Sequence, residues 1–291
     1  MKKRNWILLL LIAAVLAVYA GYRQYDALIT DTKPPVISID ETQMMECSVQ
    51  TPKTDFLQGV SASDRRDGDL TEKLVIEDMF LVDESGLTEV LYGVADKSGN
   101  VAKTSREIRY TDYKSPKFDL NRPLIYEKGD EFDVMQNIFA TDVLDGDIQH
   151  RIRATAVTEG SITKEGVHKV HFQVANSLGD LSEIILPVEV LEQDAYAADL
   201  TLTDYMIYLP QNAPFNPRAY LNEFTYRTEK TSLKSGLPED FSLETKGNVM
   251  TQTPGVYSLE YRVTYTVEHA TNPEFDQHFT GYSKMIVVVE G

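Results

Sequence analysis

Apolar and polar residues alternate over three separate stretches of the chain, and a glycine opens each of them. In the first stretch, Gly86 is followed by Val90, Tyr92 and Val94, with one residue between successive apolar positions. The same spacing returns as Gly166, Val170, Phe172 and Val174, and again as Gly255, Leu259, Tyr261 and Val263. An apolar side chain at every second position is typical of a half-buried β-strand. The three copies predict three similar modules in a row.

Turn signals and returning strands follow these stretches. Residues 96–100, Asp-Lys-Ser-Gly-Asn, predict a hairpin turn because Gly and Asn tolerate positive φ, and residues 101–110 then form the closing strand. Residues 176–180 take the place of this turn in the second copy. Pro187 in the next strand predicts an edge position or a bulge, since proline cannot donate to a ladder. The third copy has a longer loop at residues 268–277.

The chain divides on this pattern into a membrane segment and three modules of about 80 to 95 residues. Module one covers residues 33–112, module two 113–193 and module three 194–291. Short strands separated by turns, with no convincing long helix in the modules, predict β-sandwiches. Residues 210–238 of module three predict at most a short turn near residues 217–224.

The N-terminal segment predicts a transmembrane helix. Residues 1–5 are basic, and residues 6–22 carry no charge, which gives a helix of about 26 Å. Trp6 lies at one end of it, and tyrosines lie at the other, where amphipathic rings favour the membrane interface. Positive charge before the helix predicts a cytoplasmic N-terminus and an extracellular location for residues 24–291, after a spacer at 23–32.

A cleaved signal peptide is the competing interpretation of the same segment. Val-Tyr-Ala at residues 18–20 offers a small-residue cleavage site. The apolar run is longer than a usual signal core, and Tyr19 and Tyr22 resemble interface anchors, which favours a retained signal-anchor. Both interpretations export the rest of the chain.

An acidic pattern, Ala-x-Asp-x-x-Asp-Gly-Asp followed by an apolar residue, occurs at residues 62–70 and again at 140–148. Its acidic residues are Asp64, Asp67, Asp69, Asp142, Asp145 and Asp147. Carboxylates at close spacing suit calcium, so these six are candidate calcium ligands, although the EF-hand pattern is absent. The alternative is that the aspartates cap local turns and that Gly68 and Gly146 supply the turn conformation.

Several stretches of modules one and two resemble the immunoglobulin-like (Ig-like) repeats of bacterial surface proteins, the DUF5011 and HYR-like group. The stretches that carry this resemblance are Pro-Pro-Val-Ile at 34–37, residues 59–64, Asp-Gly-Asp-Leu-Thr at 67–71 and residues 94–102. The resemblance is strong over 33–112, has drifted over 113–193 and retains only the alternating strand over 194–291. It implies an all-β fold of three tandem Ig-like sandwiches, a surface or adhesive setting and no enzymatic activity.

The net negative charge of the chain excludes one class of binding partner. The chain has 45 acidic and 28 basic residues and a formal net charge of −17. A field of this sign repels phosphate backbones, so we expect no nucleic-acid partner. Cys47 is the single cysteine, which excludes an intrachain disulfide.

Module three breaks the repeat pattern and is the best candidate for a specific binding surface. Its aromatic and basic middle segment contributes the candidate ligand-binding residues Tyr220, Phe224, Tyr226 and Arg227. Loops on a rigid sandwich commonly carry recognition. The alternative is that these aromatic residues fill the core of the module.

No motif of a serine hydrolase, zinc protease, phosphate loop or dinucleotide site is present, so no catalytic or cofactor-binding residue is predicted. The sequence therefore predicts a non-enzymatic, membrane-anchored extracellular protein that binds or adheres to protein or glycan at the bacterial cell envelope. The alternative hypothesis is a structural or accessory subunit of an envelope or polysaccharide assembly machine.

Overall fold

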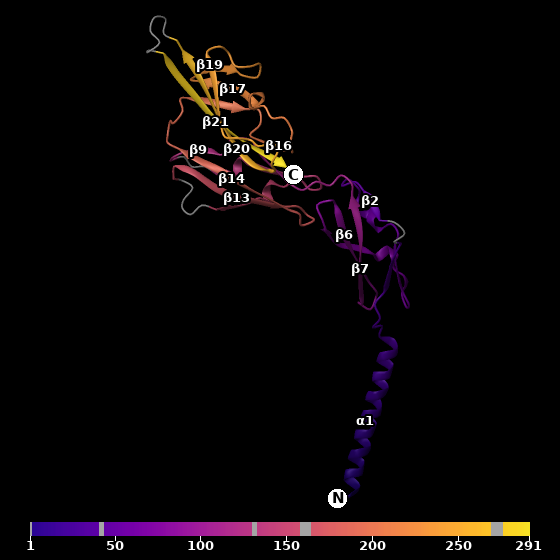
Figure 1. The fold of residues 1–291 in the computed structure, drawn as a ribbon. Coiled ribbons are helices and arrows are strands. Elements are labelled where there is room, and N and C mark those ends of the chain that lie inside the picture. Colours follow the sequence, from indigo (N-terminus) through magenta and orange to yellow (C-terminus); the bar gives the residue numbers. More distant parts are fainter. Residues whose placement is uncertain (1, 41–43, 130–132, 158–163, 269–275) are drawn as a thin grey trace. The chain divides into compact units, whose positions relative to one another are not determined.

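The computed structural model describes residues 2–40, 44–129, 133–157, 164–268 and 276–291. Figure 1 gives the order of the elements. The chain divides into two compact units, Met1–Lys114 and Ser115–Gly291. The first contains module one, and the second contains modules two and three. The predicted division at residue 193 within the second unit stays a prediction.

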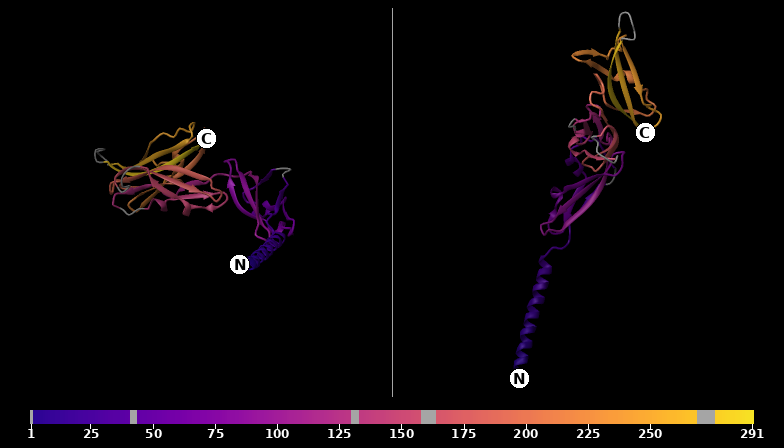
Figure 2. Two further views of the ribbon diagram at one scale, coloured as in Figure 1. Left: turned by 90° about the horizontal axis from the view of Figure 1, so that it is seen from below. Right: turned by 90° about the vertical axis from the view of Figure 1, so that its left-hand side faces the viewer.

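The first unit begins with α1 (Lys2–Ile29), the one α-helix among the described residues, and Figure 2 shows the N-terminus at its free end. The stretch Leu8–Asp26 is long and apolar enough to cross a membrane, and none of it is buried within the fold. A signal sequence would meet the same criterion. The helix continues past the predicted end at residue 22 and includes most of the predicted spacer.

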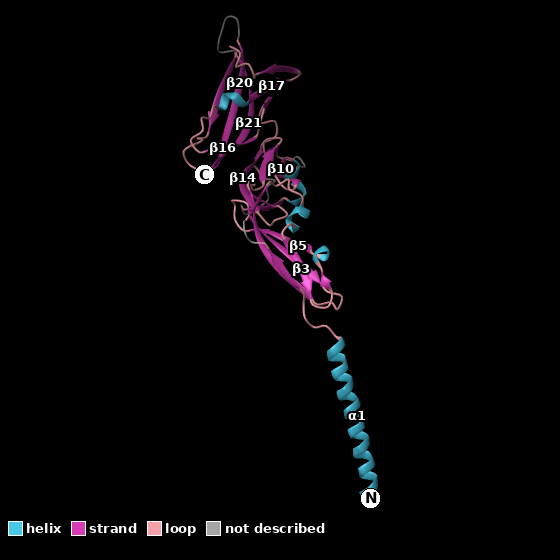
Figure 3. Cartoon of the chain, turned by 90° about the vertical axis from the view of Figure 1, so that its right-hand side faces the viewer, coloured by secondary structure: helices cyan, strands magenta, loops and turns pink. Residues whose placement is uncertain are grey.

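Module one is a sandwich of two sheets, and Figure 3 shows that strands dominate it. One sheet has the order β1-β3-β4 and the other β2-β7-β6-β5. The strands are β1 (Val36–Ile39), β2 (Met45–Cys47), β3 (Val60–Asp64), β4 (Gly68–Asp69), β5 (Val75–Leu81), β6 (Leu87–Ala95) and β7 (Val101–Tyr110), with short 3₁₀ helices η1 (Lys53–Leu57) and η2 (Thr71–Lys73). The alternation that predicted β6 buries Val90, Tyr92 and Val94 in the core.

Module two repeats this topology strand for strand. Its sheets have the orders β8-β10-β11 and β9-β14-β13-β12, and the short β9 pairs in parallel with β14 as β2 does with β7. The elements are β8 (Lys117–Leu120), β9 (Ile125–Glu127), η3 (Val134–Gln136), β10 (Ile138–Asp142), β11 (Gly146–Asp147), η4 (Gln149–Arg151), β12 (Arg153–Ala156), β13 (Gly166–Ala175) and β14 (Leu181–Leu191). Pro187 pairs with Lys169 of β13, and the pairing with β9 begins only at Glu189, so proline occupies a locally open edge among the described strands.

Module three is formed by one continuous sheet of order β18-β17-β15-β21-β20-β19, with β16 also on β21. Its elements are β15 (Ala198–Leu202), β16 (Met206–Pro210), η5 (Pro217–Tyr220), β17 (Leu221–Tyr226), β18 (Glu229–Ser232), β19 (Phe241–Lys246), β20 (Gly255–Val267) and β21 (Gln277–Glu290). The Phe224 ring of β17 lies 5.1 Å from the Phe241 ring of β19, so the two ends of the sheet meet over the core. Most of the predicted loop at 268–277 lies outside the described residues.

Modules two and three share buried contacts. Met206 and Ile286 of module three belong to the core of module two. The Tyr208 hydroxyl accepts from the Phe118 N–H and donates to the Phe118 carbonyl, each at 3.0 Å, and burial raises the pKa of this phenol to about 12. The Lys284 ammonium, 6% exposed, pairs with Glu189. Removing module three would therefore open the core of module two to water.

Candidate functional site

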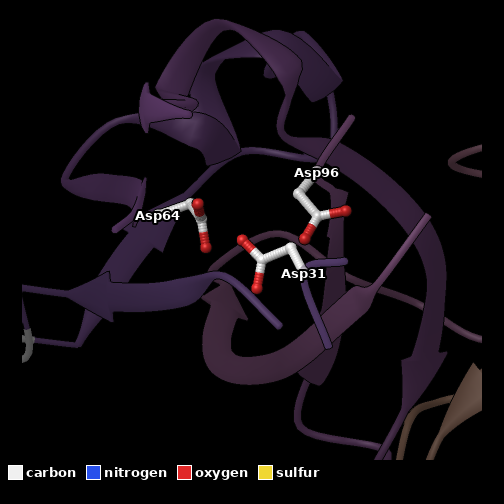
Figure 4. A group of neighbouring side chains, drawn as sticks. All are labelled: Asp31, Asp64 and Asp96. Atoms are coloured by element: carbon white, nitrogen blue, oxygen red, sulfur yellow. The ribbon is translucent and has the colours of Figure 1, made fainter. Parts of the chain in front are cut away.

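Three carboxylates meet in the first unit, as Figure 4 shows for Asp31, Asp64 and Asp96. Asp31 follows α1, Asp64 ends β3, and Asp96 begins the turn between β6 and β7. Each offers one oxygen, and these oxygens all lie within 4.8 Å of one another. Asp64 is 9% exposed and Asp96 7% exposed, so two of the three charges are largely withdrawn from water.

The acidic pattern builds the turn that positions Asp64. Its Oδ1 accepts from the backbone N–H groups of Arg66, at 2.7 Å, and Asp67, at 2.9 Å. Gly68 then takes φ +78°, which an L side chain rarely adopts, and starts β4. The aspartate thus caps its own turn through Oδ1 and also belongs to the carboxylate cluster.

Asn100 holds Asp96 and also the segment after α1. Its backbone N–H donates to Asp96 Oδ1 at 2.8 Å, and its Nδ2 donates to Asp96 Oδ2 at 2.7 Å. Burial raises the pKa of Asp96, but the hydrogen bonds from Asn100 and the turn amides outweigh it and hold this pKa below its usual value. The same Nδ2 lies 3.1 Å from the Asp31 carbonyl, which fastens the segment after the helix to the sandwich.

The donor set fits a hard divalent cation. Calcium binds oxygens at about 2.3–2.6 Å, so two oxygens on one ion can be at most about 5 Å apart. The 4.8 Å limit of this cluster satisfies that condition. Arg66 lies beside the cluster, with its Nε 3.6 Å from Asp31 Oδ2, and its side chain is 45% exposed. Asp31, Asp64 and Asp96 are therefore the described residues best placed to hold calcium.

The structure separates the residues of the acidic pattern that the sequence grouped together. Asp67 accepts from the Lys97 N–H at 2.7 Å and pairs with the Lys97 ammonium at 3.3 Å. Asp69 caps the Thr71 N–H at 2.9 Å. Hydrogen bonds from the Lys97 backbone and from Thr71 hold the pKa of Asp67 and of Asp69, respectively, below the usual value. Only Asp64 of the three joins the carboxylate cluster.

Sequence reasoning missed Asp31 and Asp96 as partners of Asp64. A signal for Asp96 was present, since it begins the turn at 96–100 that follows the strand after the acidic pattern. Asp31 gave no signal, because it stood in a segment assigned as a spacer. Its role depends on the chain folding back across the end of the sandwich.

The corresponding residues of module two make a different arrangement. Asn176 occupies the place of Asp96, and its Nδ2 donates to Asp142 Oδ2 at 3.1 Å. Asp142 Oδ1 caps Leu144 N–H and Asp145 N–H, both at 2.9 Å. Among the described residues, the only group of three acidic or metal-binding side chains at ligand spacing is the one in module one.

Asp145 and Asp147 of module two also bind protein groups. Asp145 accepts from the Ser177 N–H at 2.7 Å and pairs with Arg151. Asp147 caps the Gln149 N–H at 2.9 Å. Calcium binding by any of the six predicted aspartates stays a prediction, and the geometry brings only Asp64 into a carboxylate group.

The four candidate residues of module three differ in accessibility. Phe224 is 1% exposed and lies in the core, where it cannot touch a ligand without unfolding of the module. Tyr220 is half-buried beside Phe215. Tyr226 stacks on Phe279 at 3.9 Å, and the exposed Arg227 guanidinium lies 5.0 Å from the Tyr226 ring. Tyr226, like Tyr220, is partly buried and packs against the core of module three, so Arg227 is the exposed residue of this set.

Comparison with known proteins gives distant similarities. No family model matches the chain, so membership of the DUF5011 and HYR-like group stays a prediction. The chain is 25% identical over 252 residues to the pesticidal crystal protein Cry22Aa of Bacillus thuringiensis, a match that covers 84% of this chain and 32% of that protein. It is 29% identical over 120 residues to an uncharacterized 81.3 kDa protein of Acholeplasma phage L2, which covers 41% of this chain and 15% of the phage protein. The chain thus spans about a third or less of these relatives.

Solved structures with similar folds include the CBM51-2 domain in complex with GlcNAc and INT domains of Clostridium perfringens ZmpB, at 18% identity and a TM-score of 0.22, covering 58% of this chain and 31% of that one. Drosophila N-cadherin EC1-4 is similar at 10% identity and a TM-score of 0.21, covering 90% and 76%. Similarities this low carry no ligand or partner over to this chain.

Proposed function

We propose that this chain is a non-enzymatic, membrane-anchored binding protein that presents its Ig-like sandwiches outside a bacterial cell and binds or adheres to protein or glycan of the envelope. The observation that carries the proposal is α1. Its apolar stretch Leu8–Asp26 is wholly unburied, which is costly in water and favourable in a bilayer. Trp6 and Tyr22 are exposed near the two ends of this stretch, as interface anchors are.

The length of α1 supports anchoring rather than mere export. Its 28 residues rise about 42 Å, whereas the hydrocarbon core is about 30 Å thick. Residues 23–29, about two turns of the helix that carry Arg23 and Asp26, follow the uncharged stretch at 6–22. Asp31 follows the end of α1 closely, so anchoring through α1 would bring the candidate cation site near the membrane.

The accessible surface of module three supports a binding role. Arg227 has φ +54° in the two-residue turn between β17 and β18, a conformation that Gly or Asn adopts more easily. A cation held above a stacked tyrosine at such a position suits recognition of a polar or anionic partner. Tyr226 and Arg227 are the residues that we assign to this contact.

The topology is tested by single-cysteine labelling of the full chain in cells, in a Cys47→Ser background. We expect a membrane-impermeant maleimide to label Ser98→Cys and to spare Lys3→Cys until the membrane is permeabilised. Release of a shortened Ser98→Cys protein into the medium would identify a cleaved signal instead of an anchor. Labelling of Lys3→Cys in intact cells would overturn the orientation.

Binding is tested by co-sedimentation of the nanodisc-embedded full chain with cell-envelope fragments and, separately, with host matrix. We expect Tyr226→Ser and Arg227→Gln to lower the bound fraction severalfold, while the conservative variant Arg227→Lys retains most of it. Point variants are required because truncation after residue 193 would expose the core that Ile286 completes. Equal binding by all variants would overturn the assignment to module three.

An apolar edge in module one favours the accessory-subunit hypothesis as the second candidate. β5 is an edge strand of its sheet, and Val75, Phe80 and the adjoining Val82 are about half exposed there. Exposed apolar edges are sites of pairing with another chain. If Phe80→Ser abolished a complex recovered by cross-linking from membranes while envelope binding by Tyr226 variants stayed normal, this second function would replace the first.

A further inference from the structure

Module two has a surface hollow of about 480 Å³ that is distinct from the carboxylate cluster and from the Tyr226–Arg227 surface. Its polar walls are His150, Arg151, Arg153 and Gln173, and Leu181 contributes apolar surface. A hollow of this size accommodates a sugar ring or a small organic acid.

The polar lining is rich in cationic hydrogen-bond donors. Two arginines and a histidine line the hollow, and none of its lining residues is acidic. This contrasts with a chain in which acidic residues outnumber basic ones by 45 to 28. Guanidinium groups bind carboxylate and phosphate through charge-assisted, often bidentate hydrogen bonds.

Neighbouring side chains fix two of these donors in place. Arg151 pairs with Asp145, which in turn accepts from the Ser177 N–H and hydroxyl at 2.7 and 2.8 Å. Gln173 donates to Glu183 at 3.0 Å. Donors whose rotamers are already fixed lose less entropy when a ligand arrives.

Arg153 is the arginine of the site that has no ion-pair partner among the described residues. It lies on the edge strand β12, directly across from Gln173. Its side chain is exposed, and among the described residues it has no ion-pair partner within 4.0 Å. The positive charge of Arg151 is offset by Asp145, so Arg153 supplies the net attraction for an anion.

Module one provides a natural comparison, because it has the same strands at the same places. The positions of His150, Arg151 and Arg153 are occupied there by Glu72, Lys73 and Val75. An acid replaces the imidazole of His150, and an aliphatic side chain replaces the guanidinium of Arg153. The sandwich fold therefore does not require the cationic lining, which is particular to module two.

We propose that this hollow binds a single carboxylate or phosphate group carried on a sugar-sized body, with Arg153 as the principal contact. The site goes beyond the proposed function, since it lies on another module and does not depend on Tyr226, Arg227 or the membrane helix.

The experiment is ligand-observed saturation-transfer NMR on the full chain in nanodiscs of uncharged lipid. The probes are glucuronate, glucose 6-phosphate and uncharged glucose. We expect one or both anions to bind and glucose not to bind. Arg153→Gln should weaken anion binding about tenfold, the effect of losing one charge-assisted contact. Arg122→Gln, which removes an exposed arginine elsewhere in the second unit, should leave it unchanged.

If one anion binds, it shows whether the site prefers a carboxylate or a phosphate group. If both bind, the site recognises the negative charge that they share. Equal weakening by Arg122→Gln would mean diffuse attraction and overturn the site. Saturation transfer to glucose, no transfer to any probe, or no effect of Arg153→Gln would overturn it as well. The envelope-binding test is independent of these outcomes, because its variants at Tyr226 and Arg227 leave Arg153 unchanged.

Discussion

Modules one and two place the same turn at the same position of the same sandwich and complete it with different chemistry. In module one, Asp64 faces Asp96 and Asp31 as a group of carboxylates. In module two, Asp142 faces Asn176, and the amide donates to the carboxylate. In module two the carboxylate thus receives an amide hydrogen bond, whereas in module one it lies beside two further carboxylates.

The comparison separates the hydrogen bonds that build the turn in both modules from the additional carboxylates that are found in module one. Asp64 and Asp142 each cap two backbone N–H groups two and three residues ahead, so the repeated acidic pattern is explained by the turn. We expect a cation to bind in module one, where Asp96 from the next hairpin and Asp31 from the segment after α1 join Asp64. Calcium dependence should therefore be confined to module one.

The largest effect is expected from Asp142→Ala. It removes three hydrogen bonds around a residue that is 7% exposed and leaves the buried Asn176 amide without this partner, at a cost of about 3 kcal/mol of unfolding free energy. Asp64→Ala, measured in chelator, should cost about 1 kcal/mol or less, because losing its turn bonds is offset by relief of repulsion among the carboxylates.

Hydrogen-exchange mass spectrometry of the full chain resolves the two units separately, which a single melting curve would not. Asp147→Ala serves as the matched control, since it removes one exposed cap, to Gln149, from the same turn. Equal costs for Asp64→Ala and Asp142→Ala in chelator would mean that the carboxylates of module one do not repel one another.

The next effect is that of calcium on module one. For a site of extracellular type, with a Kd of about 10⁻⁴–10⁻³ M, calcium at ten times the Kd should stabilise the first unit by about 1.4 kcal/mol and leave the second unit unchanged. Asp96→Asn, which copies the residue of module two, should abolish this response and keep the fold. Hydrogen exchange in chelator and in calcium measures both.

Asn176→Asp provides the reverse control, since it sets a second carboxylate against Asp142 and should destabilise the second unit in chelator. If the hydrogen-exchange protection of the first unit is identical with and without calcium, the cation site is wrong. Turn capping then explains all six predicted aspartates.

The sequence predicted the local features and missed the long-range ones. β7 and the turn before it were expected at their observed bounds, and the alternation predicted β6, because alternation and turn chemistry act over a few residues. The grouping of Asp64 with Asp31 and Asp96 was not predicted, since it depends on three segments about 30 residues apart meeting at one end of the sandwich. The sequence also did not distinguish the buried Phe224 from the partly buried Tyr226, because both belong to one aromatic segment.

The smallest effect is on acid stability. The pKa of Asp96 is held below its ordinary value of 3.8, chiefly by Asn100 against the opposing effect of burial. A carboxyl whose folded pKa is lowered contributes stability that is present above its unfolded pKa and is lost as the pH falls through the folded pKa. The first unit should accordingly lose stability below about pH 3.8, and Asp96→Asn should remove this part of the loss.

The measurement is the ¹³C chemical shift of the Asp96 carboxyl as a function of pH, in chelator. Asn100→Ala, which removes the Nδ2 donor but keeps the backbone N–H, should move the midpoint upward towards 3.8 or beyond, since burial then acts with less opposition. A midpoint at or above 3.8 in the unsubstituted chain would mean that repulsion from Asp31 and Asp64 outweighs the amide bonds. In that case the cluster would hold a proton where we expect it to hold a cation, and the contrast with module two would be one of protonation.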